Sequence, residues 1–333
     1  MDSFPAAVIK NRMVEVLQTN LSDINIIIDY LLQSSGKMLR PRLVYLSALL
    51  TPHEIHKVID ISVAVELIHM ASLLHDDVID RADCRRGRES VNHRWGNQAS
   101  VLTGDYLFAA AFNLINRHDL DQVMDSITST IQIMCTGEIK QMSMNGDLGI
   151  TEEDYYDKTY RKTACLFASS CRVGALVAQA PPEQVKILER FGLNLGYAYQ
   201  LIDDVLDFTA DPEELGKPAG NDLTQGNITL PVILALKDHE KGIKLRNLLE
   251  DGKSTLDKMP LVVNILWECG ALEKSIMQSG RFLQQALDHL HQLPANPARN
   301  ALKDTVLYLM DSYYQRLMDS KQGGEGWLQS GNA

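Results

Sequence analysis

Two aspartate triplets stand out in this sequence because both have the same spacing. One lies in LLHDDVID and the other in QLIDDVLD, so each has acids at positions i, i+1 and i+4 within apolar sequence. On a helix, residues i and i+4 share a face and i+1 lies beside it. Carboxylates about 4 Å apart repel each other by roughly 1 kcal/mol even in water. The triplets therefore predict a bound cation, and ligands that are all oxygen favour Mg²⁺. The predicted metal ligands are Asp76, Asp77, Asp80, Asp203, Asp204 and Asp207.

Basic residues gather near these acids although the whole chain is acidic. They are Lys37, Arg40, Arg42, Arg81, Arg85, Arg86, Arg88, Arg94, Arg161, Lys162 and Lys217. Arginine-rich segments are commonly solvated faces, and that interpretation stays open for each segment taken alone. Beside two aspartate triplets, however, Arg and Lys indicate a phosphate or diphosphate substrate, because the metal bridges phosphate oxygens and the cations neutralise the rest.

The composition limits the class of protein. Of the 333 residues, 45% are hydrophobic, which is enough for a sizeable core and excludes disorder. The net charge of −11 argues against a nucleic-acid partner. The five cysteines lack zinc spacing and are interpreted as reduced thiols of a cytoplasmic protein.

The start of the chain lacks signal-peptide character. The most apolar run, Ile61 to Leu74, is taken as too short to span a membrane, so a soluble protein is expected. Peripheral membrane contact for product release stays open.

Apolar residues recur at helical spacing through most of the chain, and alternation typical of strands is hard to find. Thr151 followed by three acids predicts a helix start. Two segments rich in Gly and Pro interrupt the pattern, at Gly36 to Pro41 and at Thr209 to Pro231. The pattern predicts an all-α domain of about a dozen helices over residues 1–319, and residues 320–333 are expected to form a flexible tail. The predicted helical stretches are His53 to Arg86, Ser100 to Cys135, Thr151 to Arg172 and Glu183 to Phe208.

Several motifs occur together and in order between Gly36 and Leu236. They are GKMLRP, LLHDDVIDRADCRRGR, TGDYLF, KTA, YQLIDDVLD and GKPAGNDLTQGNITLP. With these motifs the chain resembles the trans-isoprenyl diphosphate synthases, which make farnesyl, geranylgeranyl and longer prenyl diphosphates. Within that family the sequence of these motifs is most similar to that of the large catalytic subunits of bacterial hexaprenyl and heptaprenyl diphosphate synthases. The resemblance implies a helical bundle around a central cavity. One departure is Asn227, where many members have Lys, so that one phosphate contact is lost or supplied otherwise.

The resemblance also implies roles for individual residues. Asp76, Asp80 and Asp203 would bind three Mg²⁺ ions, supported by Asp77, Asp204 and Asp207. The allylic diphosphate would be held by Arg85, Lys162 and Lys217, with Thr163 and Gln200 nearby. Isopentenyl diphosphate would be held by Lys37, Arg40, His69 and Arg86. The residues expected to take part in catalysis are Asp76, Asp80, Asp203, Lys162 and Lys217.

The mechanism expected from these residues is ionisation of the allylic diphosphate. Mg²⁺ and basic residues draw charge from its C–O bond, a dry pocket protects the carbocation, and the alkene of isopentenyl diphosphate attacks it. Ala71 and Ser72 lie just before the first triplet, where short-chain relatives place aromatic residues. Small residues here predict an open pocket and a long polyprenyl product. The resemblance implies a product of hexaprenyl or heptaprenyl length, for quinone side chains such as that of menaquinone.

Other functions stay open at this point. A short-chain synthase would differ only in product length. A class I terpene cyclase shares the fold and the first motif, but its second motif has Asn, Ser and Glu in place of the aspartates. A non-catalytic regulatory subunit would have degraded triplets, whereas both are intact here. The likeness to large subunits predicts an oligomer, either a homodimer or a heteromer with a small non-catalytic subunit.

Overall fold

A computed structural model describes residues 4–33, 36–209, 219–250, 255–308 and 311 of the chain. These residues are helical apart from short connections and one two-residue strand pair. They divide into two compact units. The first comprises residues 1–130, 166–192 and 289–302, and the second comprises 131–165, 193–288 and 303–333. The predicted tail, 320–333, lies outside the described residues, and the single domain over 1–319 stays a prediction.

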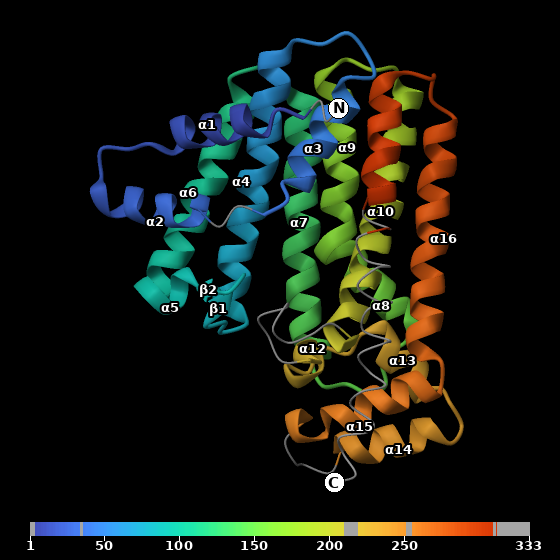
Figure 1. Ribbon diagram of the computed structural model, residues 1–333. Helices are drawn as coiled ribbons and strands as arrows, with labels where there is room; N and C mark the ends of the chain where they lie inside the picture. The colour runs from blue at the N-terminus through green and yellow to red at the C-terminus, as the bar shows by residue number, and fades with distance from the viewer. Residues whose placement is uncertain (1–3, 34–35, 210–218, 251–254, 309–310, 312–333) are drawn as a thin grey trace. The chain divides into compact units, whose positions relative to one another are not determined.

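The first unit is built around helix α4 (Ile55–Ile79), which packs against α6 (Asn97–Asn116), α3 (Leu39–Ala48) and α1 (Ala6–Leu17). Figure 1 shows α4 beside α6. Buried residues lie on every side of α4 between Val58 and Ile68, as expected for a core helix that is apolar all round. The unit also contains α2 (Ser22–Gln33), α5 (Val91–Trp95) and the strands β1 (Cys84–Arg85) and β2 (Arg88–Glu89).

Helix α4 corrects one argument from the sequence. The whole helix is long and apolar enough to cross a membrane by length and composition, so the shortness of the run from Ile61 to Leu74 does not by itself argue against a membrane span. Burial is the better argument, because 67% of its most apolar window is buried inside the protein. The helix therefore has the surroundings of a core helix.

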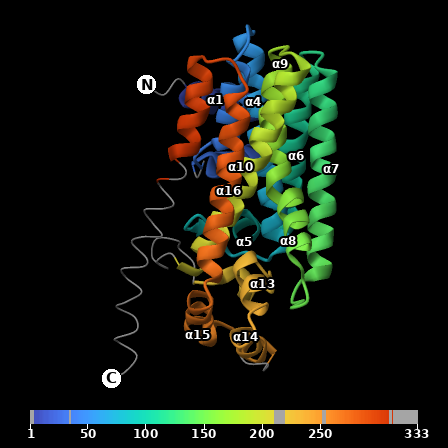
Figure 2. The same cartoon turned by 90° about the vertical axis from the view of Figure 1, so that its right-hand side faces the viewer.

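The second unit contains the second triplet and several helices. They are α8 (Glu152–Thr159), the π-helical segment η1 (Tyr160–Ala164), α12 (Asn221–Thr224), α13 (Leu230–Leu236), α14 (Lys241–Glu250), α15 (Thr255–Glu268) and α16 (Ala271–His291). Helices α13, α14 and α15 contact one another and lie together in Figure 2. Helices α7 (Asp121–Met144), α9 (Cys165–Val177) and α10 (Pro182–Thr209) contribute residues to both units, and the last residues of α16, from His289 on, belong to the first. Residues 297–308 are also helical.

Most predicted helices are present, and one predicted stretch is divided. Thr151 begins α8 with a complete capping box, in which its hydroxyl accepts from the Asp154 N–H and the Asp154 carboxylate accepts from the Thr151 N–H. The stretch from Ser100 to Cys135, however, is two helices rather than one. Helix α6 ends at Asn116, and Asp119 takes a left-handed backbone with φ of 53° before α7 begins. Asp is one of the few residues other than Gly that adopt this conformation readily.

Candidate active site

The first triplet lies at the C-terminal end of α4, and its three acids differ in exposure. Asp77 is buried, with 2% of its surface exposed, whereas Asp76 is half-buried and Asp80 is exposed. Asp80 is the C-cap of the helix, and its N–H donates to the carbonyl of Asp76 at 2.8 Å. The two acids at positions i and i+4 are therefore the more accessible pair, and the middle acid points inward.

A short hairpin holds the middle acid. Arg85 lies in β1, and its Nε donates to Oδ1 of Asp77 at 2.6 Å. The amide of Asn92 donates to the backbone carbonyl of Asp77 as well. The two residues of the turn, Arg86 and Gly87, both have positive φ, of 53° and 72°. Such a pair matches the twist of a tight antiparallel hairpin. Asp77 thus anchors Arg85, which the sequence assigned to the allylic diphosphate.

Arg86 lies against the loop that carries Lys37. A Cβ built on Gly36 would come within 2.7 Å of the Arg86 guanidinium, so a larger residue here would displace the end of the Arg86 side chain. Met38, which precedes α3, has a positive φ of 48°. The GKMLRP segment is therefore shaped to fit over the second arginine of the hairpin. This contact brings together two motifs that the sequence placed at the isopentenyl diphosphate site.

Arg40 and His69 form a direct contact. Nη1 of Arg40 lies 3.1 Å from Nε2 of His69, and its guanidinium stacks 4.8 Å from the centre of the Phe167 ring. Burial holds the pKa of His69 well below its usual range, and the charges of Arg40 and Arg86 lower it further. His69 is therefore neutral at physiological pH and accepts a hydrogen bond from Arg40. The predicted grouping of Arg40, His69 and Arg86 is present in the structure.

A cavity of about 50 Å³ lies beside these residues in the first unit. Its charged and polar lining includes Arg85, Arg86 and Arg88 together with His69. It also includes Glu66, which the sequence analysis missed. Burial raises the pKa of Glu66, although the charges of Arg40 and Arg86 act against that rise. The acids Asp77 and Glu89 line the cavity as well, so its charged lining is mixed. Its three arginines are the side chains that could contact an anionic group such as a diphosphate.

The predicted chain-length residues differ from each other in their surroundings. Ala71 is fully buried in the first unit, whereas Ser72 is half-buried and donates a hydrogen bond to the carbonyl of His69 at 2.9 Å. Neither residue lines the cavity near Glu66. A role in product length stays a prediction for both.

The second triplet repeats the division seen in the first. Asp203 is exposed and Asp207 is half-buried, whereas Asp204 has only 3% of its surface exposed. The carboxylate of Asp204 accepts from the hydroxyl of Tyr155 at 2.6 Å and from Nε2 of Gln200 at 2.8 Å. Again the middle acid is held by the protein and the i and i+4 acids are the more accessible pair.

Carboxylates crowd one another around this triplet. Asp207 accepts from the backbone N–H of Asp222 at 3.1 Å. Burial raises the pKa of Asp204 and of Asp207 well above the usual range, and the charge of Asp222 raises both further. Burial is the larger cause of this rise, and repulsion from Asp222 is the part that reflects neighbouring negative charge. A bound cation would relieve this repulsion.

The KTA motif lies in the π-helical segment η1, a feature often found at functional sites. The hydroxyl of Thr163 donates to Oε1 of Gln200 at 2.7 Å, which links the motif to Asp204 through the Gln200 amide. Lys162 pairs with Glu138 at 3.0 Å. Thr163 and Gln200 thus belong to the support of Asp204, and their predicted place beside the allylic diphosphate stays a prediction.

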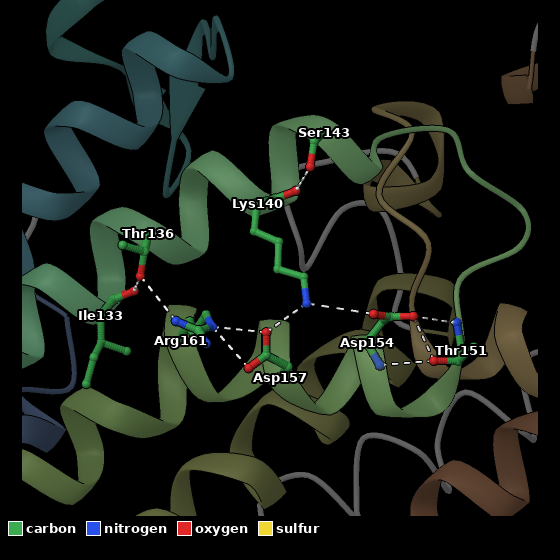
Figure 3. Close-up of polar contacts among 8 residues, drawn as sticks. All are labelled: Ile133, Thr136, Lys140, Ser143, Thr151, Asp154, Asp157 and Arg161. Carbon is green, nitrogen blue, oxygen red and sulfur yellow. Dashed lines mark hydrogen bonds and ion pairs between the residues drawn. The ribbon is translucent and has the colours of Figure 1, made fainter.

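Arg161, the neighbour of Lys162, has a structural role. Its Nε binds both oxygens of Asp157, at 3.0 and 2.9 Å, and its Nη1 donates to the hydroxyl of Thr136. Figure 3 shows that Asp157 also binds Lys140, which reaches across from α7. This network joins α7 to α8 and leads to the capping box of α8. Lys217 lies outside the described residues.

The donors present fit magnesium held jointly with phosphate. Within the described part of the chain, no group of three or more His, Cys, Asp or Glu side chains is arranged to hold a metal ion. Mg²⁺, however, is commonly bound by one or two carboxylates together with substrate phosphates and water, rather than by a cage of protein ligands. The accessible i and i+4 acids of each triplet, with arginines nearby in the first unit, match that mode.

Comparison with known proteins assigns the family. A family model described as Polyprenyl synthetase matches residues 22–266. The chain belongs to this family. Among its relatives, component 2 of heptaprenyl diphosphate synthase from Geobacillus stearothermophilus is 39% identical over 303 residues, covering 91% of this chain and 94% of that protein. The octaprenyl diphosphate synthase of Escherichia coli (strain K12) is 35% identical, covering 87% of this chain and 90% of its own length.

Solved structures of other polyprenyl synthases have the same fold. The heptaprenyl diphosphate synthase from Staphylococcus aureus aligns with a TM-score of 0.86 at 30% identity, covering 91% of this chain and 96% of that one. A polyprenyl synthase from Caulobacter crescentus CB15, complexed with calcium and isoprenyl diphosphate, also aligns with a TM-score of 0.86 at 30% identity, covering 91% and 93%. The all-α fold, the family and the enzyme class predicted from the sequence are confirmed. The chain is a prenyltransferase, a polyprenyl diphosphate synthase.

Proposed function

We propose that this enzyme condenses isopentenyl diphosphate head-to-tail onto an allylic diphosphate, with Mg²⁺, to give a long-chain trans-polyprenyl diphosphate. The observation that carries this proposal is the repeated design of the triplets. In both, the middle acid is buried and held by the protein, while the acids at i and i+4 are more accessible. A single triplet would suffice for a cyclase that binds one diphosphate. Two intact triplets, with the arginine-lined cavity, favour a synthase that binds two substrates.

The residues of the first unit would bind and orient substrate. Asp76 and Asp80 would contribute carboxylate ligands to Mg²⁺, and Asp203 and Asp207 would do so in the second unit. When bound, Mg²⁺ neutralises charge that develops on the departing diphosphate. The Arg85–Asp77 pair fixes the guanidinium of Arg85 at one end of the cavity. Charge-assisted contacts of this kind orient a diphosphate as well as attract it.

The Arg40–His69 pair would hold the isopentenyl diphosphate. Because His69 is neutral, it offers Arg40 an acceptor without removing its positive charge. Arg86 packs against Gly36 and lines the same cavity as His69. The arrangement binds an anion but supplies no nucleophile, as expected where the substrate alkene itself attacks.

The relatives support a long product. Those named above make heptaprenyl and octaprenyl diphosphates, according to their names. We place the product of this chain in the hexaprenyl to heptaprenyl range. The name "component 2" indicates that those heptaprenyl synthases have a partner. We therefore favour a heteromer with a small non-catalytic subunit over a homodimer.

Turnover by the purified chain tests this function. The chain is supplied with farnesyl diphosphate, isopentenyl diphosphate and Mg²⁺, and the products are resolved by chromatography while sedimentation reports the oligomeric state. We expect Mg²⁺-dependent consumption of isopentenyl diphosphate by the chain, and full formation of products beyond geranylgeranyl length in the presence of its small partner subunit. Consumption of farnesyl diphosphate alone would indicate a cyclase and overturn the proposal. A fully active monomer that makes long products by itself would overturn the proposed heteromer.

Kinetics of lysine variants test the proposed division of substrates. Lys37→Ala should raise the KM for isopentenyl diphosphate far more than the KM for the allylic substrate, and Lys162→Ala should do the reverse. Lys10→Ala, an exposed lysine of α1, is the matched control and should change neither constant. Equal effects of Lys37→Ala on both constants would show that the division into two sites is wrong.

A further inference from the structure

Lys158 is a buried lysine that the sequence analysis did not single out. It lies in α8 with 8% of its surface exposed. Its Nζ donates to Oδ1 of Asn227 at 2.6 Å and to the backbone carbonyl of Ile228 at 3.0 Å. Within the described ranges, these two acceptors are its hydrogen-bond partners, and both are uncharged. A buried ammonium without a carboxylate in contact is costly, so its charge requires an explanation.

The surroundings of Lys158 connect it to the second triplet. Its Nζ lies 5.6 Å from the centre of the Tyr155 ring, and the hydroxyl of the same tyrosine donates to Asp204. Burial lowers the pKa of Lys158, while the charges of Asp204 and Asp222 act in the opposite direction. The side chain of Tyr155 thus contacts both the Lys158 ammonium and Asp204, the buried acid of the triplet.

Tethering of the loop does not account for this lysine. The loop after α12 is already held by the N–H of Gly146, which donates to the carbonyl of Gly226 at 2.8 Å. The N–H of Asn227 also donates to the carbonyl of Asp222 at 2.8 Å. An uncharged donor at position 158 would serve equally well as a further tether. What distinguishes lysine from such a donor is the positive charge.

We propose that Lys158, held by Asn227, is a positioning residue that supplies a fixed positive charge to the second aspartate site and thereby attracts the allylic diphosphate. Asn227 then serves as the acceptor that fixes the ammonium. The positive charge beside the site is supplied by Lys158 on α8 rather than by a lysine at position 227. This inference rests on the proposed function, because it assumes that a diphosphate binds beside the second triplet.

Charge and hydrogen bonding can be separated at this position. Lys158→Gln keeps a donor for the two oxygens but removes the charge, and Lys158→Arg keeps both. We expect Lys158→Gln to raise the KM for farnesyl diphosphate on the order of tenfold, the scale of one charge acting across about 10 Å at an effective dielectric constant near 20. The KM for isopentenyl diphosphate should change less than twofold, and Lys158→Arg should retain most of the affinity. Lys237→Gln, which removes an exposed lysine paired with Glu152, is the matched control.

A charge exchange provides a second test. The double variant Lys158→Gln/Asn227→Lys returns a positive charge to the same contact from the other side and should recover the KM for farnesyl diphosphate. Asn227→Lys alone places two ammonium groups together and should lower thermal stability. Circular dichroism checks that each variant is folded. If Lys158→Gln is unstable, the double variant is compared with wild type instead. An unchanged KM for farnesyl diphosphate then supports the inference, and a raised KM contradicts it.

Calorimetric titration with Mg²⁺ and inorganic pyrophosphate gives a readout that does not need turnover. Lys158→Gln should bind pyrophosphate more weakly than both wild type and Lys237→Gln. If the wild type turns over both substrates but Lys158→Gln matches the control in KM and in titration, the inference is wrong and the proposed function stands. If the wild type does not consume isopentenyl diphosphate, the proposed function fails, and the titration alone decides whether Lys158 attracts a diphosphate.

Discussion

Exchange of single acids within the first triplet should separate folding from catalysis. Asp77→Asn removes the charge that binds Arg85 at 2.6 Å. A hydrogen bond to a charged group contributes about 1.5–3 kcal/mol, and since 34% of the Arg85 side chain is exposed, we expect the lower end of this range. Asp76→Asn changes a more accessible acid and should alter the free energy of unfolding by less than about 0.5 kcal/mol. The loss of stability should therefore follow the middle acid.

Turnover should respond in the opposite order. Asp76→Asn removes a proposed metal ligand and should reduce turnover on the order of 10²–10³, the scale of one electrostatic contact in the transition state. Asp77→Asn should reduce turnover less, through misplacement of Arg85. Urea unfolding without Mg²⁺, followed by steady-state kinetics with it, measures both quantities. Equal stability losses in the two variants, or near-normal turnover of Asp76→Asn at limiting Mg²⁺, would refute the division of the triplet.

Two further predictions concern stability and product length. Asp60 accepts hydrogen bonds from Arg12 and His118, each at 2.8 Å, and although burial acts to raise its pKa, these donors hold that pKa below its usual value. The unfolded chain therefore binds the proton more readily, so this stabilisation is complete above about pH 5 and is lost as pH falls below about 4. Urea unfolding between pH 3.5 and 6 tests this: the free energy of unfolding of Asp60→Asn should depend less steeply on pH than that of wild type. Ser72→Phe should shorten the product at little cost in stability because Ser72 is half-buried, whereas Ala71→Phe should cost about 1–3 kcal/mol because Ala71 is fully buried. Product chromatography and thermal unfolding check both variants, and wild-type chain lengths from Ser72→Phe would contradict a tunnel at this position.

The helices were predictable where local signals agree with packing. Thr151 and Asp154 carry a complete capping signature, and α8 begins where that signature places it. The break before α7 was missed because it has neither Gly nor Pro, and Asp119 adopts a left-handed conformation without a distinctive pattern around it. The hairpin at Arg86 and Gly87 was missed because its strands are only two residues long. Alternation cannot be recognised over so short a span.

The candidate site was predictable as a set of residues but not as a set of contacts. The spacing of the acids identified both triplets, and two partners of the middle acids are close in sequence, Arg85 to Asp77 and Gln200 to Asp204. Other contacts of the site join distant segments. Tyr155 lies 49 positions from Asp204, and Lys158 lies 69 positions from Asn227. Nothing in the local sequence marks Glu66 as a wall of the cavity, because a lone acid in an apolar helix has no periodic signature. Such pairings depend on how helices pack, which residue types and spacing do not specify.

The common design of the triplets explains why the middle position is acidic at all. A buried acid needs donors, and in both triplets these come from fixed side chains, Arg85 for Asp77 and Tyr155 with Gln200 for Asp204. Together with the packing of each helix, these contacts favour one rotation of the helix about its own axis. Because residues i and i+4 lie next to i+1 on the helix, that rotation also determines where the accessible carboxylates point. An apolar residue at the middle position could fill the space, but it would not specify a partner. The buried acid therefore acts on the proposed metal ligands through geometry, which is how a supporting residue orients a metal site.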